Sequence, residues 1–260
     1  MGFGRVAERV FHCGIVEACD TVRAEWRRGE CRRLRKTGQV RPLSAEVLPI
    51  SAEHPDPRMI RYAAGWLNRG AVIAIPTDTL YALAADPVNL AAIDEIFRVK
   101  GRPETRALPI LISSLEHAAI LAKELPDNFY KLAEACWPGP LTIVVDASNR
   151  LPLKVTANTR RVALRWPKNE VVTRLIQELG VPLTGTSANV SGSPTCASGD
   201  EVFRQLGDRI PLILDSGETQ GIMPSTIVEL RGDQWCIGRE GALPNDDIRD
   251  ALNGDEGVVA

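Results

Sequence analysis

A buried strand followed at once by a cluster of hydroxyl groups constrains this chain more than any other feature. Residues 71–75 form a short apolar run, rich in β-branched side chains, between Gly70 and Pro76, which is typical of a buried strand. Residues 76–81 then read Pro-Thr-Asp-Thr-Leu-Tyr, so two threonines and an aspartate stand just past the strand end. In open α/β sheets, ligands bind outside the carboxyl ends of the strands. The segment therefore predicts a binding site for a polar ligand.

Helical and strand patterns alternate along most of the remaining chain. Asp56 and Pro57 predict a helix start and Gly70 a helix end, after an extended lead-in over residues 44–56. Further helices are expected over residues 89–100, 114–125, 127–137, 170–179 and 200–206. Strands are expected over residues 108–112, 141–145, 161–165, 181–184, 210–214, 226–230 and 234–237. The alternation, with strands clustered late, predicts one α/β domain with a mixed sheet over residues 50–250.

Positive charge is concentrated near the N-terminus. Residues 1–43 hold nine arginines and one lysine against five acids, a net charge of +5. The chain total is −2, so the remainder carries −7. We expect residues 1–43 to be a basic, poorly ordered N-terminal extension. A nucleic-acid-binding arm and an upstream extension from a misplaced start codon stay open as readings, whereas the five acids argue against a targeting peptide.

The composition disfavours several classes of protein. No apolar run approaches the ~20 residues that span a bilayer. The six cysteines form no Cys-x-x-Cys pair, which indicates reduced thiols in a cytoplasmic protein. The histidines, His12, His54 and His117, lie outside the polar motifs. A Ser-His-Asp relay and a histidine-ligated metal site are therefore both poorly supported.

Candidate site residues fall at or beside the predicted strand ends. They are Thr77, Thr79, Lys100, Arg102, Arg106, Thr142, Arg161, Arg165, Ser187, Asn189, Ser191, Ser225 and Arg239. Five arginines and one lysine against the single acid Asp78 predict a cationic pocket. Arginine matches phosphate and carboxylate with a planar fork of donors, while hydroxyls and amides orient a ligand without adding charge. Chemistry in such a pocket depends on positioning and charge stabilisation, as in phosphoryl and nucleotidyl transfer, with Mg²⁺ often assisting.

Six short motifs occur in order within residues 55–245. They are Pro-Thr-Asp-Thr-Leu-Tyr, Lys-Gly-Arg-Pro, Trp-Pro-Gly-Pro-Leu-Thr, Ala-Leu-Arg-Trp-Pro, Thr-Ser-Ala-Asn-Val-Ser-Gly and Pro-Ser-Thr-Ile-Val. Together they resemble the motifs of the YrdC/Sua5 family, the threonylcarbamoyl-AMP synthases. The resemblance implies a twisted open mixed sheet with flanking helices and a large cationic concave cavity. It also implies that L-threonine, bicarbonate and ATP yield threonylcarbamoyl-AMP and pyrophosphate, with Mg²⁺ carried by the nucleotide and no metal site in the protein.

Residue roles are implied by the resemblance, motif by motif. Lys100 and Arg102 would be catalytic. The groups that bind L-threonine would be Thr79, Arg165, Gly185 and Ser225. Those that bind ATP would be Arg102, Arg106, Arg161, Ser187, Asn189, Thr195 and Arg239. The product would pass to a threonylcarbamoyl transferase complex that makes the t6A modification of tRNA, with tRNA itself a weak partner and no membrane involved.

The chain departs from the family pattern at three places. Ala82 stands where a glycine is usual, and residues 106–109 read Arg-Ala-Leu-Pro instead of containing the usual Asn-Pro-Leu. Leu111 stands where some longer members have histidine, so contacts to threonine there are expected to be apolar. The chain resembles the short, single-domain type. Two alternatives stay open: a non-catalytic RNA-binding module that uses the same cationic cavity, and a related carbamoyl-adenylate site that serves another acceptor.

Overall fold

The computed structural model describes residues 44–101, 106–221, 223–252 and the backbone of residues 258–259. The predicted N-terminal extension, residues 1–43, and the predicted catalytic residue Arg102 lie outside the described residues. In the part of the chain that is described, no helix is both long enough and apolar enough to cross a membrane.

Most described helices begin and end at signals present in the sequence. Helix α2 (Pro57–Asn68) is capped by Asp56, whose carboxylate accepts a hydrogen bond from the Arg58 N–H at 2.8 Å. Helix α3 (Leu90–Lys100) ends at Gly101 in a left-handed conformation. The others are α4 (Leu115–Leu121), α5 (Asp127–Cys136), α6 (Glu170–Leu179), α7 (Gly199–Leu206) and α8 (Asn245–Ala251). Helix α4 ends earlier than expected. Helix α8 was not predicted, because neither of its ends carries a capping side chain that would signal it in the sequence.

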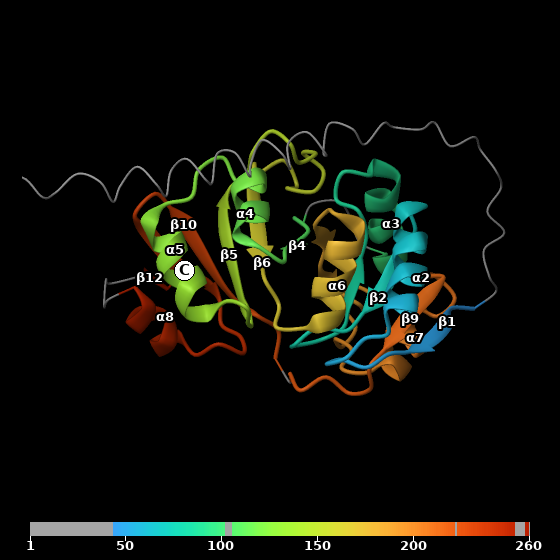
Figure 1. The fold of residues 1–260 in the computed structure, drawn as a ribbon. Helices are drawn as coiled ribbons and strands as arrows, with labels where there is room; N and C mark the ends of the chain where they lie inside the picture. The colour runs from blue at the N-terminus through green and yellow to red at the C-terminus, as the bar shows by residue number, and fades with distance from the viewer. Residues whose placement is uncertain (1–43, 102–105, 222, 253–257, 260) are drawn as a thin grey trace, which may run out of the picture. The chain divides into compact units, whose positions relative to one another are not determined.

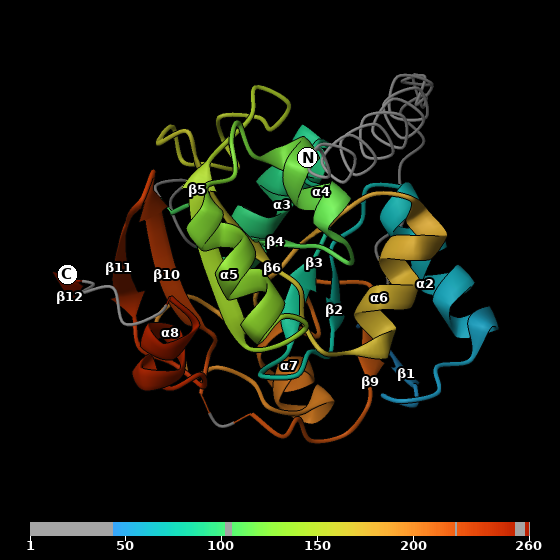
Figure 2. The same ribbon diagram turned by 60° about the vertical axis from the view of Figure 1, so that its left-hand side comes forward.

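The strands form two mixed sheets, drawn in Figures 1 and 2. The first has the order β1 (Glu46–Pro49), β9 (Leu212–Asp215), β2 (Ile73–Ile75), β3 (Ala82–Ala84) and β8 (Thr186–Ser187). The second has the order β12 (Val258–Val259), β11 (Gln234–Arg239), β10 (Thr226–Arg231), β5 (Leu141–Asp146), β6 (Arg161–Arg165), β4 (Ile110–Leu111) and β7 (Leu183–Thr184). Each sheet contains parallel and antiparallel pairs. The predicted α/β class with mixed pairing is confirmed, but the strands divide between two sheets where one was expected.

Gly185 is the point at which the chain passes from one sheet to the other. The preceding strand β7 pairs with β4, whereas the following strand β8 pairs with β3. A Cβ atom on Gly185 would lie 2.5 Å from the Leu111 side chain, so any larger residue here would require Leu111 to move. The division was not visible in the sequence because it depends on which distant strands pair with two-residue segments.

Both faces of the five-stranded sheet are buried at its strands β2 and β3. Ile73 and Ile75 of β2 face one hydrophobic cluster, to which α2 and α6 contribute, while Ala74 faces the other. The two-residue period of a strand sends alternate side chains to opposite faces. Figures 1 and 2 show α2 and α6 side by side near β2, and α5 beside β5 and β10. The hydrophobic cluster that Ala74 faces also contains Ile143 and Val228 of the seven-stranded sheet, so the two sheets share a core.

Candidate active site

The predicted hydroxyl turn after β2 is a closed network of buried threonines. Thr77 donates from its hydroxyl to the Leu80 carbonyl at 2.7 Å and accepts from the Thr79 N–H at 3.1 Å. The two threonine hydroxyls lie 3.1 Å apart. Because the Thr77 proton is used on Leu80, the Thr79 hydroxyl donates to Thr77 and presents its lone pairs to another donor.

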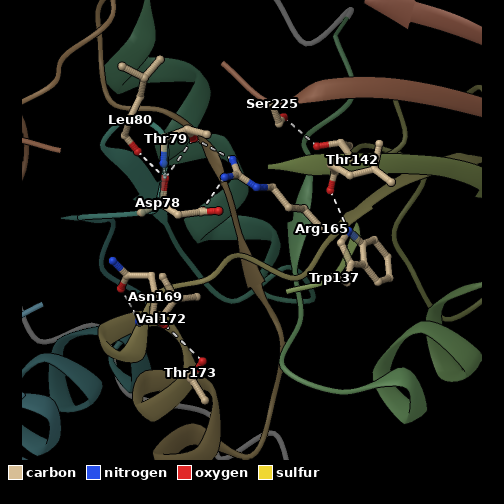
Figure 3. A network of polar contacts seen from close by, with 12 residues as sticks. Asp78, Thr79, Leu80, Trp137, Thr142, Arg165, Asn169, Val172, Thr173 and Ser225 are labelled. Carbon is tan, nitrogen blue, oxygen red and sulfur yellow. Dashed lines mark hydrogen bonds and ion pairs between the residues drawn. The ribbon is translucent and has the colours of Figure 1, made fainter. Parts of the chain in front are cut away.

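That other donor is Arg165, the last residue of β6. Its Nη1 donates to Thr79 Oγ1 at 2.9 Å, and its Nη2 donates to Asp78 Oδ1 at 2.5 Å (Figure 3). Burial lowers the pKa of Arg165, Asp78 raises it, and nearby Arg239 lowers it. The guanidinium stays protonated because its ordinary pKa is far above neutral. Two buried atoms of this pair, Arg165 Nε and Asp78 Oδ2, have no hydrogen-bond partner among the described residues.

A second pair of hydroxyl groups lies on β5, which pairs with β6, and at the start of β10. Thr142 of β5 and Ser225, which precedes β10, have their hydroxyl oxygens 2.8 Å apart (Figure 3). Parallel pairing of β5 with β10 brings them together, since Leu141 is in register with Thr226. Arg239, at the end of β11, donates to the Ser225 carbonyl at 2.7 Å and to its hydroxyl at 3.3 Å. Burial lowers the pKa of Arg239.

Lys100 is buried at the end of α3 and holds the loop that follows β8. Its Nζ donates to the carbonyl oxygens of Ser187 at 2.5 Å and Asn189 at 3.0 Å, and to Asn189 Oδ1 at 3.3 Å. The Ser187 hydroxyl donates to the same Oδ1 at 2.6 Å. The Ala188 N–H donates to the Tyr81 carbonyl at 2.8 Å, so this loop lies beside the hydroxyl turn. Sequence motifs more than a hundred residues apart therefore meet.

Other predicted site residues lie farther from these contacts. Arg161 stands at the opposite end of β6 from Arg165, where its guanidinium donates to Asp146 Oδ1 at 2.9 Å and to the Leu230 carbonyl at 2.8 Å. Thr195 and Arg106 are exposed, and Ser191 is exposed with its N–H donating to the Lys100 carbonyl at 2.9 Å. The predicted nucleotide contacts of Arg161, Thr195 and Arg106 stay predictions.

A cavity of about 520 Å³ opens beside the hydroxyl turn. Its wall includes Thr77, Asp78, Pro138, Trp166, Ser216 and Thr219. The acidic side chains along its lining are Glu53, Asp78, Glu170 and Glu218, against one lysine, Lys168. This cavity is not itself cationic, and the predicted cationic surface stays a prediction.

The sequence analysis did not identify three residues that pack around the turn after β2, namely Tyr81, Asp215 and Gly221. The Tyr81 hydroxyl contacts Asp215 and the loop after it, and burial raises the pKa of Tyr81 to about 12. Gly221 approaches so closely that a Cβ there would lie 2.4 Å from the Thr79 backbone. Tyr81 belongs to an identified motif, and Asp215 directly follows a predicted strand. These two signals could have marked both residues as candidate site residues. Gly221 carried no local signal.

Comparisons with known proteins agree with the motifs. The sequence profile of the Sua5/YciO/YrdC family, described as "Telomere recombination", matches residues 66–241. A threonylcarbamoyl-AMP synthase of Pyrococcus abyssi is 37% identical over 193 residues, which are 74% of this chain and 57% of that protein. A putative threonylcarbamoyl-AMP synthase of Mycobacterium tuberculosis is 32% identical, over 76% of this chain and 91% of that protein.

Two solved structures are similar as well. The structure of Pyrococcus abyssi Sua5 complexed with L-threonine has a TM-score of 0.78 and 35% identity, covering 81% of this chain and 62% of that one. Escherichia coli YciO has a TM-score of 0.72 over 78% of this chain and 99% of its own, and at 24% identity it supports the fold alone. The chain thus spans a little over half the length of the Pyrococcus proteins and nearly all of the shorter relatives.

Proposed function

Because this chain belongs to the Sua5/YciO/YrdC family, we propose that it makes threonylcarbamoyl-AMP and pyrophosphate from L-threonine, bicarbonate and ATP. The observation that carries the proposal is the buried fork of Arg165, held between Thr79 and Asp78 beside the cavity. A fixed guanidinium matches the carboxylate of an amino acid. The relative with bound L-threonine supports the same substrate.

The proposed reaction has two bond-forming stages. The threonine ammonium first gives one proton to solvent. The neutral amine nitrogen then bonds to the carbon of bicarbonate, and water leaves, which gives a carbamate. A carbamate oxygen then bonds to the α-phosphorus of ATP, and the bond to the departing pyrophosphate breaks. The described polar motifs contain hydroxyls, amides and cations, which suits a reaction catalysed by positioning and charge stabilisation.

Threonine would lie against the turn after β2 and the start of β10. Arg165 would hold its carboxylate, with Thr79 and Ser225 supplying hydroxyl contacts. Gly185 would meet the ligand through its backbone, since the Leu111 side chain fills the space that a Cβ would take. Arg239 donates to neutral groups of Ser225 in the described structure, so it adds a positive charge near Arg165.

ATP would lie on the side of Lys100 and the loop after β8. Lys100 brings a buried positive charge to Ser187 and Asn189, and fixes the loop whose side chains would meet the phosphates. Arg102, Arg106, Arg161, Thr195 and Arg239 complete the proposed nucleotide contacts. Mg²⁺ would arrive with the nucleotide; among the described residues no group of three His, Cys, Asp or Glu side chains is arranged to hold a metal.

The proposed place of the reaction is the cytoplasm, in synthesis of the t6A modification of tRNA. A threonylcarbamoyl transferase complex would consume the adenylate. A non-catalytic RNA-binding role has less support. Thr77, Thr79 and Thr142 are each at most 4% exposed, so their hydroxyls are enclosed rather than presented to a large polyanion.

The decisive experiment measures pyrophosphate release with threonine, bicarbonate and ATP each omitted in turn. We expect release only when all three are present, together with a product that has the mass of threonylcarbamoyl-AMP. Serine and valine serve as competing amino acids, which report on the side-chain preference. Equal pyrophosphate release without threonine would contradict the proposed function.

A further inference from the structure

We propose that Asp78 accepts a hydrogen bond from the α-ammonium group of the amino-acid substrate, which makes it the residue that selects a free amino acid over other carboxylates. The inference rests on the proposed function and assigns a recognition partner to the ammonium group of threonine, which is bonded to the same carbon as its carboxylate. Asp78 lines the 520 Å³ cavity, and its side chain is 13% exposed.

The hydrogen-bonding capacity of Asp78 is only partly used. Its Oδ1 accepts from Arg165 Nη2, while Oδ2 is buried with no partner among the described residues. An ionised carboxylate offers about four acceptor sites. Rotation about the Cβ–Cγ bond is soft and exchanges the two oxygens, so either one can face the cavity while the other keeps Arg165. A buried carboxylate oxygen without a donor is unfavourable, and a ligand donor would relieve it.

The charge balance at this place favours a zwitterion. Asp78 neutralises Arg165, so a ligand that carries only a carboxylate gains little from the guanidinium and approaches an anion as well. A zwitterion can place its carboxylate near Arg165 and Arg239 and its ammonium near Asp78, which keeps every charge paired. Glu53 and Glu218, which also lie along the cavity, favour a cationic group there as well.

A competing explanation is that Asp78 only orients Arg165. The two explanations differ in their effect on a ligand that lacks the ammonium group. If Asp78 is only an orienting residue, its loss weakens every carboxylate ligand by a similar factor. If Asp78 contacts the ammonium, the loss of Asp78 weakens the binding of threonine. The same loss strengthens, or leaves unchanged, the binding of a deamino analogue of threonine in which a hydrogen atom replaces the α-amino group, because that analogue has no donor for Asp78.

The test is titration calorimetry of L-threonine and of that deamino analogue, with and without a non-hydrolysable ATP analogue. The proteins are the full chain, Asp78→Asn, and Asp146→Asn as a matched control. Asp146, the last residue of β5, forms an ion pair with Arg161, the other arginine of strand β6. We expect Asp78→Asn to lose about 10- to 100-fold in threonine affinity, the range for a buried charge-assisted contact, without loss of analogue affinity. Asp146→Asn should bind threonine within about twofold of the unaltered chain.

Each outcome has one meaning. Equal weakening of both ligands in Asp78→Asn, or equal affinity of the unaltered chain for both ligands, overturns the inference and leaves the proposed function standing. No threonine binding by the unaltered chain, together with threonine-independent pyrophosphate release, overturns the proposed function and the inference with it. The comparison of the two ligands on the unaltered chain holds even if the Asp78→Asn protein fails to fold.

Discussion

The Tyr81 hydroxyl lies 2.9 Å from Asp215 Oδ1 and thereby joins the hydroxyl turn to a residue 134 positions later in the chain. The same oxygen accepts from the Ser216 N–H at 3.0 Å and lies 2.7 Å from the Gly217 carbonyl. The loop that follows lines the cavity through Ser216 and Thr219 and returns to the Thr79 backbone at Gly221. Tyr81 is therefore the anchor of one wall of the candidate site.

Replacement of Tyr81 by phenylalanine should loosen that wall. We expect the free energy of unfolding to fall by about 1–3 kcal/mol, because Asp215 and the Ser216 N–H lose a buried partner. The KM for threonine should rise more than the KM for ATP, since the loop lines the cavity beside Thr77 and Asp78. Thermal unfolding and steady-state kinetics measure both effects. Tyr130→Phe, at an exposed tyrosine on α5, is the control and should change neither.

The raised pKa of Tyr81 adds a pH dependence to the same comparison. Burial raises it from 10.0 to about 12, so the neutral phenol is favoured in the folded state. Its contribution to stability is complete below the unfolded pKa and is lost as pH rises between these two values. The difference in stability between the unaltered chain and Tyr81→Phe should shrink over this range. A difference that stays constant would show that the phenol is not buried.

Replacement of Lys100 by alanine should impair both activity and stability. Three acceptors on Ser187 and Asn189 lose a charged donor, and the loop after β8 loses its side-chain attachment to α3. We expect activity to fall about 10- to 100-fold and stability by about 2 kcal/mol. Pyrophosphate release and thermal unfolding are the measurements, with the exposed Lys123→Ala as control. Unchanged activity would remove Lys100 from the site.

Replacement of Arg165 by lysine should raise the KM for threonine more than the KM for ATP. Lysine keeps the charge but cannot contact Thr79 and Asp78 through a rigid fork while it holds a carboxylate. Arg174→Lys, at an exposed arginine paired with Glu170 on α6, is the matched control. A larger effect on ATP than on threonine would reassign Arg165 to the phosphates.

The thiol of Cys196 should resist alkylation in the folded protein. Burial raises its pKa to about 11, with Glu201 adding to the shift and Lys100 opposing it. The reactive thiolate is then scarce at pH 8, and the side chain is buried as well. Mass spectrometry after iodoacetamide treatment should find Cys196 unmodified in the native protein and modified in urea. Rapid native labelling would mean that the segment around it opens readily.

A chain that begins at Ser44 should retain adenylate formation. The first described strand, β1, starts at Glu46 and pairs with β9, so this truncation keeps every described element. If residues 1–43 serve as an RNA arm, their removal should weaken tRNA binding in a salt-dependent way and leave ATP turnover unchanged. Turnover and tRNA affinity at two salt concentrations measure this. Loss of turnover or of solubility would assign the segment to the catalytic domain.

Signals that act over a few residues were sufficient to predict much of the secondary structure. The bounds of β6 and α6 were predicted to the residue, and the helix that Asp56 caps was found where it was expected. The polar residues after β2 were identified because a proline ended an apolar run. Caps, periodicity and turn residues are local properties of the chain, and a sequence displays them directly.

Contacts between distant segments were decided by the tertiary structure. Helix α4 ends at Leu121 because Ala122 and Lys123 pair with the end of β5, at Ala147 and Asp146. Asp78 and Arg165 are 87 residues apart, and only the positions of their strands bring the carboxylate onto the guanidinium. Such pairings depend on the path of the whole chain. The amino-acid sequence therefore determined which residues were available for the site, and the packing of the two sheets determined which of them touch.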